Sequence, residues 1–130
     1  MGFIRFRAVC TVALCLLLLA LFWVPQRMLA VCSEEWNAEM DRASEALKSG
    51  DLPAAQKRCA ALTESYRQKK ASLERFLNHD AVESVMSAFG EAEVLAGAED
   101  AAGALAALAR ARGGIEHLLC IERFTWNALL

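Results

Sequence analysis

The chain has 130 residues and a mass of 14.2 kDa, which suits one domain and excludes a second of ordinary size. Its 14 basic and 16 acidic residues give a formal net charge of −2. This balance excludes the strongly basic surface that nucleic-acid-binding modules need, so no nucleic acid is expected among the partners. Hydrophobic residues make up 56% of the chain and the mean hydropathy is +0.27, and the excess is concentrated near the N-terminus.

Residues 8–24, AVCTVALCLLLLALFWV, predict a single transmembrane helix with Thr11 as its only polar member. A run of this length is at the short limit of what crosses about 30 Å of hydrocarbon. Arg5 and Arg7 precede the run and Arg27 follows it, and this excess of positive charge favours a cytoplasmic N-terminus. We therefore expect a single-pass protein of the cell membrane whose C-terminal domain is extracytoplasmic.

Two cleaved alternatives to this signal anchor stay open. Ala30-Val31-Cys32 offers the small residues that a signal peptidase prefers, although it lies far beyond the apolar run. Residues 29–32 also resemble a lipoprotein box, with Val31 where a smaller residue is usual. Uncleaved, the chain divides into two parts. Residues 1–32 form a cytoplasmic stub, the anchor and a juxtamembrane segment, and residues 33–130 form an acidic, extracytoplasmic helical domain.

The sequence from Ser33 onward predicts an all-α domain. It contains only seven β-branched residues after Ser33 and no alternation typical of strands. Four helices are expected from capping and turn signals. These signals are Ser33 as the first N-cap, Gly50 as its stop, Asp51 as the second N-cap, a capping box of Asp80 and Glu83 for the third helix, a stop near Gly97, a new start at Glu99-Asp100, and a break or kink at Gly113-Gly114.

Apolar residues recur at helical spacing within each segment and predict the core. They are Trp36, Met40, Ala43 and Leu47; Ala55, Cys59, Leu62, Tyr66, Leu73 and Phe76; Val82, Val85 or Met86, Phe89, and Leu95 or Ala96; Leu105, Leu108, Ile115, Leu118 or Leu119, and Phe124. Because the turns are short, the helices must pack as antiparallel neighbours, which gives an up-down four-helix bundle of two helical hairpins. A faint repeat agrees with two hairpins, because residues 46–51 resemble residues 95–100.

No catalytic or metal-binding constellation is recognisable. The sequence has no Cys-x-x-Cys pair, no Gly-rich phosphate loop and no nucleophile elbow. His79 lies in a turn and His117 on the last helix, and Glu116 is adjacent to His117, so the two point in different directions. We therefore expect no enzyme activity, no bound metal and no cofactor.

The five cysteines differ in position. Cys10 and Cys15 lie in the apolar run, and Cys59 lies on the core stripe of the second helix. Cys32 and Cys120 are roughly 27 Å and 30 Å from the end of the bundle that carries the turns at Gly50 and Gly97, whereas Cys59 is only about 12 Å from it. Because the first and fourth helices are neighbours in an up-down bundle, any intramolecular disulfide is predicted to join Cys32 to Cys120.

Lys69 or Lys70 must border the core, because the apolar stripe of the second helix passes through this position. We expect one of the two ammonium groups to reach an acid on the third helix, with Glu91 or Glu93 as the partner. The alternative is a solvated lysine at the edge of the core.

Three further residues are predicted as interface anchors: Trp36, His79 and Trp126. The tryptophans suit the level of lipid headgroups if the fourth helix returns toward the membrane, and the alternative is that they fill the open end of the core. His79 lies at the turn nearest the membrane, where it can cap a helix or contact a partner.

This layout resembles a bacterial family. The positions that carry the resemblance are Trp36, Ala46, Gly50-Asp51, Ala55, Tyr66, Phe76-Leu77-Asn78-His79 and the tail from Glu122 to Leu130. They are similar to the family known as domain of unknown function 4363, although Ala128 replaces a bulkier residue of the tail. The resemblance implies a small membrane-anchored, extracytoplasmic helical domain of Gram-positive-type cells. It implies no activity and transfers no catalytic residue.

Two functions from different classes remain. The first is an interaction or accessory protein, tethered to the membrane, whose partner is another envelope or membrane protein or a second copy of itself. The second is a ligand-sensing helical ectodomain that signals through a membrane partner, because only residues 1–7 lie on the cytoplasmic side. A pocket with converging polar groups inside the bundle favours sensing, whereas a filled core with exposed apolar surface favours protein binding.

Overall fold

The structure is a computed structural model that describes the backbone of residues 2–75 and 77–129. It also describes their side chains, apart from those of residues 25, 26, 122–126 and 129. Four helices occur within the described residues: α1 (Gly2–Ser49), α2 (Leu52–Glu74), α3 (His79–Gly97) and α4 (Ala101–Leu129). The prediction of an all-α fold is therefore confirmed.

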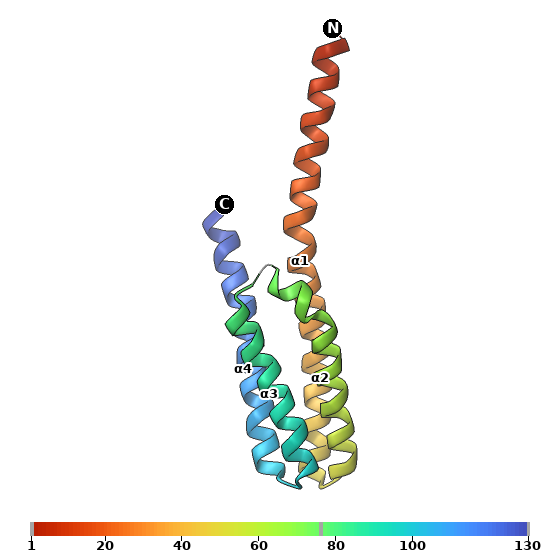
Figure 1. Ribbon diagram of the computed structural model, residues 1–130, viewed down its shortest axis with the longest axis vertical. Helices are drawn as coiled ribbons and strands as arrows, with labels where there is room; N and C mark the ends of the chain where they lie inside the picture. The colour runs from red at the N-terminus through yellow and green to blue at the C-terminus, as the bar shows by residue number, and fades with distance from the viewer. Residues whose placement is uncertain (1, 76, 130) are drawn as a thin grey trace.

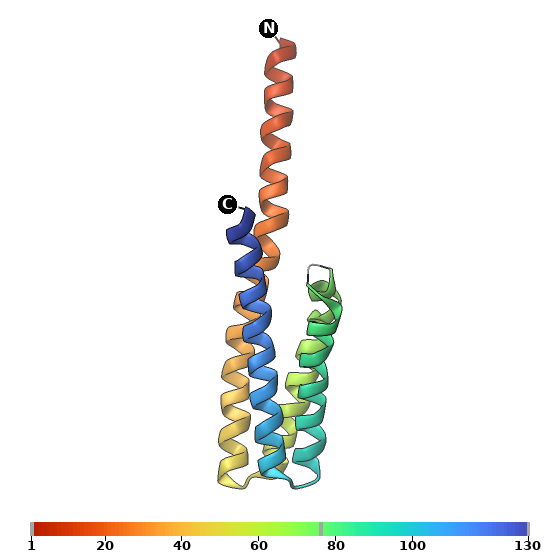
Figure 2. The same cartoon turned by 90° about the vertical axis from the view of Figure 1, so that its left-hand side faces the viewer.

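The helices pack side by side, and α1 projects far beyond the others (Figure 1). α1 contacts α2 and α4, and α3 contacts α2 and α4, so each helix has two neighbours. The second view shows that α4 also passes beyond the α2–α3 connection, toward the projecting part of α1 (Figure 2). The end of the domain with the α1–α2 and α3–α4 turns is called the distal end below, and the end with the α2–α3 connection is called the proximal end.

Helix α1 combines an exposed apolar half with a half that is part of the core. It is the one described helix long and apolar enough to cross a membrane, with a mean hydropathy of 2.5 in its most apolar window. The large apolar side chains between Phe3 and Val24 are exposed, whereas Leu29 is only 1% exposed. The core therefore begins a few residues before the predicted domain boundary at 32/33.

The predicted N-cap at Ser33 is wrong, because α1 continues through this residue. The Ser33 hydroxyl donates a hydrogen bond to the carbonyl of Ala30, 2.8 Å away, one turn back in the same helix. An N-cap serine accepts a hydrogen bond from a backbone amide at the start of a helix, whereas the Ser33 hydroxyl donates to a carbonyl of the preceding turn. Ser33 therefore does not start a new helix. Residues 27–49 have no glycine or proline, so no breaker separates the two halves downstream of Pro25.

The two distal turns share equivalent backbone hydrogen bonds, and the first has one more, from the amide of Leu52 to the carbonyl of Gly50. The amide of Asp51 donates to the carbonyl of Ala46 at 3.0 Å, and the amide of Asp100 donates to that of Leu95 at 2.9 Å. Each aspartate then caps the next helix: Asp51 accepts from the amide of Ala54 and Asp100 from that of Gly103. The predicted starts at Asp51 and Glu99-Asp100 are confirmed, and the faint repeat is the signature of one turn used twice.

The third helix starts earlier than predicted. The side chain of Asn78, whose backbone is extended, accepts a hydrogen bond from the amide of Asp80 at 2.8 Å. Asn78 is therefore the N-cap, and Asp80 already lies in the first turn of α3. The expected capping box of Asp80 and Glu83 is wrong, and both side chains are available for other contacts.

The expected break at Gly113-Gly114 is also wrong, because α4 is continuous through both glycines. A Cβ added at Gly114 would lie 2.6 Å from Cγ2 of Val85, whereas one added at Gly113 would meet nothing within 4 Å. Gly114 therefore lets α3 and α4 approach closely, and it serves packing between helices rather than bending of the chain.

The buried core runs along the inside of all four helices and matches most of the predicted stripes. Its members are Leu29, Cys32, Trp36, Met40, Ala43, Leu47, Ala55, Cys59, Leu62, Tyr66, Leu73, Val82, Val85, Ala88, Phe89, Ala92, Ala96, Ala104, Ala107, Leu108, Ala111, Ile115 and Leu118. Leu95 and Leu105 are only partly buried, and alanines beside them occupy the interior. The predicted core positions Phe76 and Phe124 fall outside the described side chains.

Candidate functional site

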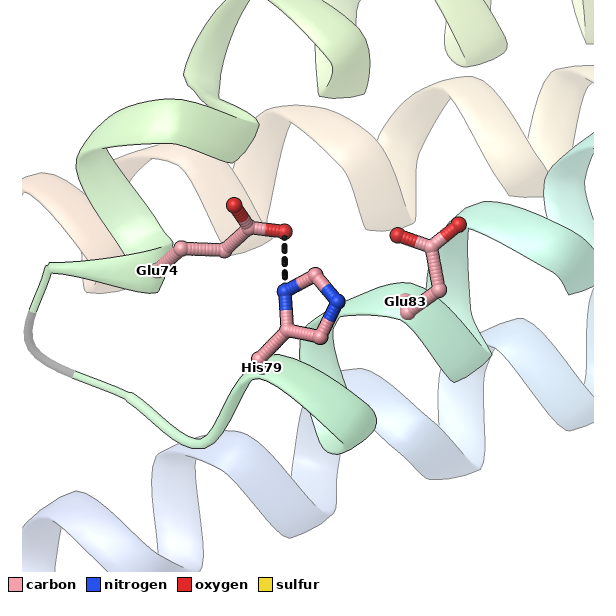
Figure 3. A group of neighbouring side chains, drawn as sticks. All are labelled: Glu74, His79 and Glu83. Carbon is pink, nitrogen blue, oxygen red and sulfur yellow. Dashed lines mark ion pairs between the residues drawn. The ribbon is translucent and has the colours of Figure 1, made fainter.

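Four ionisable side chains gather where α2 ends and α3 begins. Lys70 Nζ lies 2.5 Å from Glu83 Oε2 and 3.6 Å from Glu74 Oε1, so the ammonium is shared by two carboxylates. His79 Nδ1 lies 2.9 Å from the same oxygen of Glu74. Figure 3 shows the imidazole between the two carboxylates, with Glu74 approaching from α2 and Glu83 from α3. We call Lys70, Glu74, His79 and Glu83 the proximal cluster.

Helix geometry and one short connection bring the proximal cluster together. Lys70 and Glu74 are four residues apart on α2, and His79 and Glu83 are four residues apart on α3, so each pair shares one helix face. The Asn78 cap starts α3 at His79, which places the imidazole directly across the connection from the end of α2. The cluster therefore depends on where α3 begins.

The charges in the proximal cluster support one another. The contact with Glu83 raises the pKa of Lys70, and the contact with Lys70 lowers the pKa of Glu83, so both groups stay charged. Glu74 Oε1 and Glu83 Oε2 are shielded from solvent, and each contacts a nitrogen of the cluster: His79 Nδ1 for Glu74 and Lys70 Nζ for Glu83. Charged partners therefore take the place of water at both oxygens.

A second feature lies where α1 leaves the domain. An apolar groove of about 280 Å³ runs along α1 beside the end of α2. It is lined by Leu17, Ala20, Leu21, Val24 and Met28 of α1, with Ser72 and Arg75 of α2 at its edge. Its polar lining comes from α2, which also carries Lys70 and Glu74, and its apolar lining comes from α1.

The comparisons agree with the fold just described. The model of the family DUF4363, a domain of unknown function, matches residues 23–129. The chain belongs to this family. No curated protein and no solved structure matches the chain. The match includes the last residues of the exposed apolar segment and all of the buried core. The DUF4363 region therefore contains the point in α1 where apolar side chains change from exposed to buried.

The predicted pairing of Lys69 or Lys70 with Glu91 or Glu93 is wrong in its partner. Lys70 is half-buried and pairs with Glu83, while Lys69 is exposed. Glu91 pairs with Arg110 of α4 instead. Because α2 and α3 run in opposite directions from a short connection, a residue four before the end of α2 lies level with one four after the start of α3, far from Glu91.

Trp36 is a core residue of the DUF4363 domain and not an interface anchor. It is 2% exposed, its indole nitrogen donates to Ser65 Oγ at 3.2 Å, and its ring lies 5.1 Å from that of Tyr66. Tyr66 also contacts Phe89 edge-on at 5.4 Å and donates its hydroxyl to the carbonyl of Val82. The prediction for Trp126 falls outside the described side chains.

The predicted disulfide between Cys32 and Cys120 is not formed, and each of the five cysteines, all among the described side chains, is a free thiol. Cys32 is buried, whereas Cys120 is exposed. The interior face of α4 passes through Ile115 and Leu118. Because each residue turns the helix by about 100°, position 120 points away from Leu118 and from the core. The similar heights of the two cysteines were not enough, because their faces differ.

His79 was singled out at the correct end of the domain, but its partners Glu74 and Glu83 were missed. The His79-x-x-x-Glu83 spacing is visible in the sequence and places both residues on one helix face. To predict Glu74 as a partner of His79, one must know the length of the α2–α3 connection. That length follows from the position of the Asn78 N-cap.

Proposed function

We propose that this chain is a membrane-anchored, extracytoplasmic interaction or accessory protein. In this proposal the apolar part of α1 crosses the membrane with its N-terminus in the cytoplasm. The rest of α1 joins α2, α3 and α4 in an antiparallel up-down four-helix bundle outside the cytoplasm. The carrying observation is the change along one continuous helix from exposed to buried apolar side chains, between Val24 at 59% and Leu29 at 1% exposure.

Water is a poor environment for the exposed half of α1. Its phenylalanine, leucine, isoleucine and valine side chains are about half to three-quarters exposed over several turns, all around the helix. Each such side chain gains roughly 1.5–3 kcal/mol when it is fully removed from water. A contiguous surface of this size on a soluble protein calls for a lipid or protein environment. A lipid bilayer removes the apolar side chains on every side of the helix from water, which supports the interpretation of this segment as a membrane anchor.

The same helix supports an uncleaved anchor. Cleavage near Ala30-Val31-Cys32 would separate Leu29 from the rest of the core, and Leu29 is among its most buried members. It would also leave Cys32 and Ser33, both buried, at a free end of the chain. An intact α1 keeps these residues in a helix that is fixed on both sides.

The aromatic core supports protein binding over ligand sensing. Trp36, Tyr66 and Phe89 pack ring against ring, tilted and edge-on, among the buried side chains. The outer surface offers small apolar side chains on α4, where Ala102, Ala106 and Ala109 are exposed beside the buried Ala104, Ala107 and Ala111. A partner from the envelope or a second copy can approach such a face closely.

Orientation is tested with the exposed thiol of Cys120. A membrane-impermeant maleimide added to intact cells is expected to label the chain, and a Cys120→Ser variant is expected to lose that labelling. Cys10 and Cys15 lie in the apolar segment, and Cys59 is buried, so they contribute little signal. Labelling that requires cell lysis would contradict the extracytoplasmic placement.

The partner is tested by photo-crosslinking in intact membranes. A photoreactive residue at the exposed position 106 is expected to capture a distinct membrane or envelope protein, identified by mass spectrometry. The matched control carries the same group at position 94, where Val94 is exposed on α3 instead. Capture of the chain alone from position 106 would replace the partner with a homo-oligomer, and equal capture from both positions would remove α4 as the binding face.

A further inference from the structure

We propose that Glu74, His79 and Glu83 of the proximal cluster bind a divalent transition-metal ion of the zinc type. This inference is independent of the membrane anchor and of any protein partner. One ligand atom from each of the three residues lies within 4.8 Å of the other two. The site would join the end of α2 to the start of α3, on either side of the connection between these helices (Figure 3).

The spacing of the ligands suits a metal bound by two helices. His79 and Glu83 are one turn apart on α3, which is the separation at which two side chains of a helix meet on one ion. Glu74 supplies the third ligand from the end of α2. Tetrahedral zinc with bonds of about 2.0–2.2 Å holds its ligand atoms roughly 3.5 Å apart, so rotations of the two glutamate side chains are enough to close the site.

The donor set selects the class of ion. One imidazole nitrogen and two carboxylate oxygens suit zinc and its neighbours in the first transition row, whereas magnesium and calcium prefer oxygen ligands alone. The remaining coordination position is open to water, because the His79 side chain is 66% exposed. The imidazole distinguishes this site from the many acidic surface pairs that bind nothing.

Two shielded carboxylate oxygens already share a positive charge. Glu74 Oε1 and Glu83 Oε2 have almost no contact with solvent, and their partners are His79 Nδ1 and Lys70 Nζ. The Lys70 ammonium lies between them, at 3.6 Å and 2.5 Å, and provides the positive charge. A metal ion placed there would bond both oxygens directly, and Lys70 would turn outward to water. Lys70 is thus a competitor for the site, which makes the proposal testable in two directions.

The test is a titration of the full chain in detergent micelles with Zn²⁺, followed by calorimetry. Every variant carries Cys10→Ala, Cys15→Ala and Cys120→Ser, which remove the exposed thiols. We expect one ion per chain. His79→Gln and Glu83→Gln should each weaken binding by about tenfold or more, because a lost ligand costs at least as much as a lost supporting group. Lys70→Gln should tighten binding by about tenfold, because a competing positive charge is removed.

The matched control is His117→Gln, which removes the other histidine from an exposed position on α4 and should leave binding unchanged. Helix content from circular dichroism shows that each variant is folded. Mg²⁺ in place of Zn²⁺ should not bind. The proposal is overturned if Lys70→Gln binds no Zn²⁺, if His79→Gln binds as tightly as His117→Gln, or if Lys70→Gln weakens binding.

Discussion

The distal and proximal halves of the helical domain are held together by different means. Near the distal end the core contains many small side chains beside Leu47 and Leu108: Ala43, Ala55, Ala92, Ala96, Ala104 and Ala107. The helices there are joined by two turns with equivalent hydrogen bonds. Farther from that end, the rings of Trp36, Tyr66 and Phe89 fill the interior. Backbone geometry therefore governs the distal half, and side-chain volume governs the rest.

The largest expected effect is the loss of one ring from the aromatic group. Phe89→Ala removes a fully buried side chain and should lower the free energy of unfolding by about 3–5 kcal/mol, measured by urea denaturation. Val94→Ala is the control on the same helix, because Val94 is 69% exposed, and its effect should stay within about 0.5 kcal/mol. Similar losses in the two variants would mean that ring volume does not hold this part of the domain together.

Alkaline pH should weaken the domain through its buried thiols, because burial raises the pKa of both Cys32 and Cys59. Burial, and then Glu93, raise the pKa of Cys59 from 9.0 to about 11. Burial likewise raises the pKa of Tyr66. In the unfolded chain each group ionises at its ordinary pKa, so the unfolded state releases its proton first as pH rises. The contribution of the neutral Cys59 thiol to the free energy of unfolding is therefore fully present below pH 9 and is lost between pH 9 and about 11. The loss is at most about 1.4 kcal/mol per pH unit.

The pH effect is assigned by comparing two cysteine variants. Urea denaturation across this range should show a flatter decline for Cys59→Ala than for the parent chain. Cys120→Ala changes an exposed thiol and should leave the slope unchanged. An unchanged slope in Cys59→Ala would assign the alkaline loss to Tyr66 or to another group.

Adjacent glycines on α4 should respond in opposite directions to alanine. Gly114→Ala places a Cβ 2.6 Å from Val85, a buried and stiff side chain, and should cost about 1–2 kcal/mol net of the better helix propensity. Gly113→Ala meets no atom within 4 Å and should gain up to about 1 kcal/mol. Thermal unfolding of both variants measures the difference, and equal gains would show that α3 and α4 have room between them.

The sequence predicted the elements and most of the core, because helical spacing of apolar residues and Asp caps are local signals. It failed where the interior selects small side chains. On α4 the prediction chose Leu105, but Ala104 and Ala107 are buried and Leu105 is only partly so. Hydrophobicity favours leucine, whereas close contact between helices favours alanine, and only the packed structure reveals which dominates.

The proximal cluster was harder to predict because it depends on register between two helices. Lys70 lies four residues before the end of α2, and Glu83 lies four residues after the start of α3, so the two meet across the short connection. The predicted partners Glu91 and Glu93 lie more than two helical turns farther along α3. The disulfide prediction rested on height along the bundle, whereas rotation about α4 leaves Cys120 exposed while Cys32 is buried.

The smallest expected effect compares the two distal turns. Gly50 and Glu99 occupy equivalent positions with positive φ, 82° and 61°, which favour glycine over other residues. Glu99→Gly should therefore raise the free energy of unfolding by about 0.5–1 kcal/mol, because it relieves backbone strain at an exposed site. Glu99→Ala keeps the strain and should show no such gain, and Gly50→Ala introduces it and should lose a similar amount. A lower free energy of unfolding in Glu99→Gly would show that the Glu99 side chain stabilises the second turn more than its backbone strain destabilises it. The two turns would then be alike in their hydrogen bonds but not in the strain at this position.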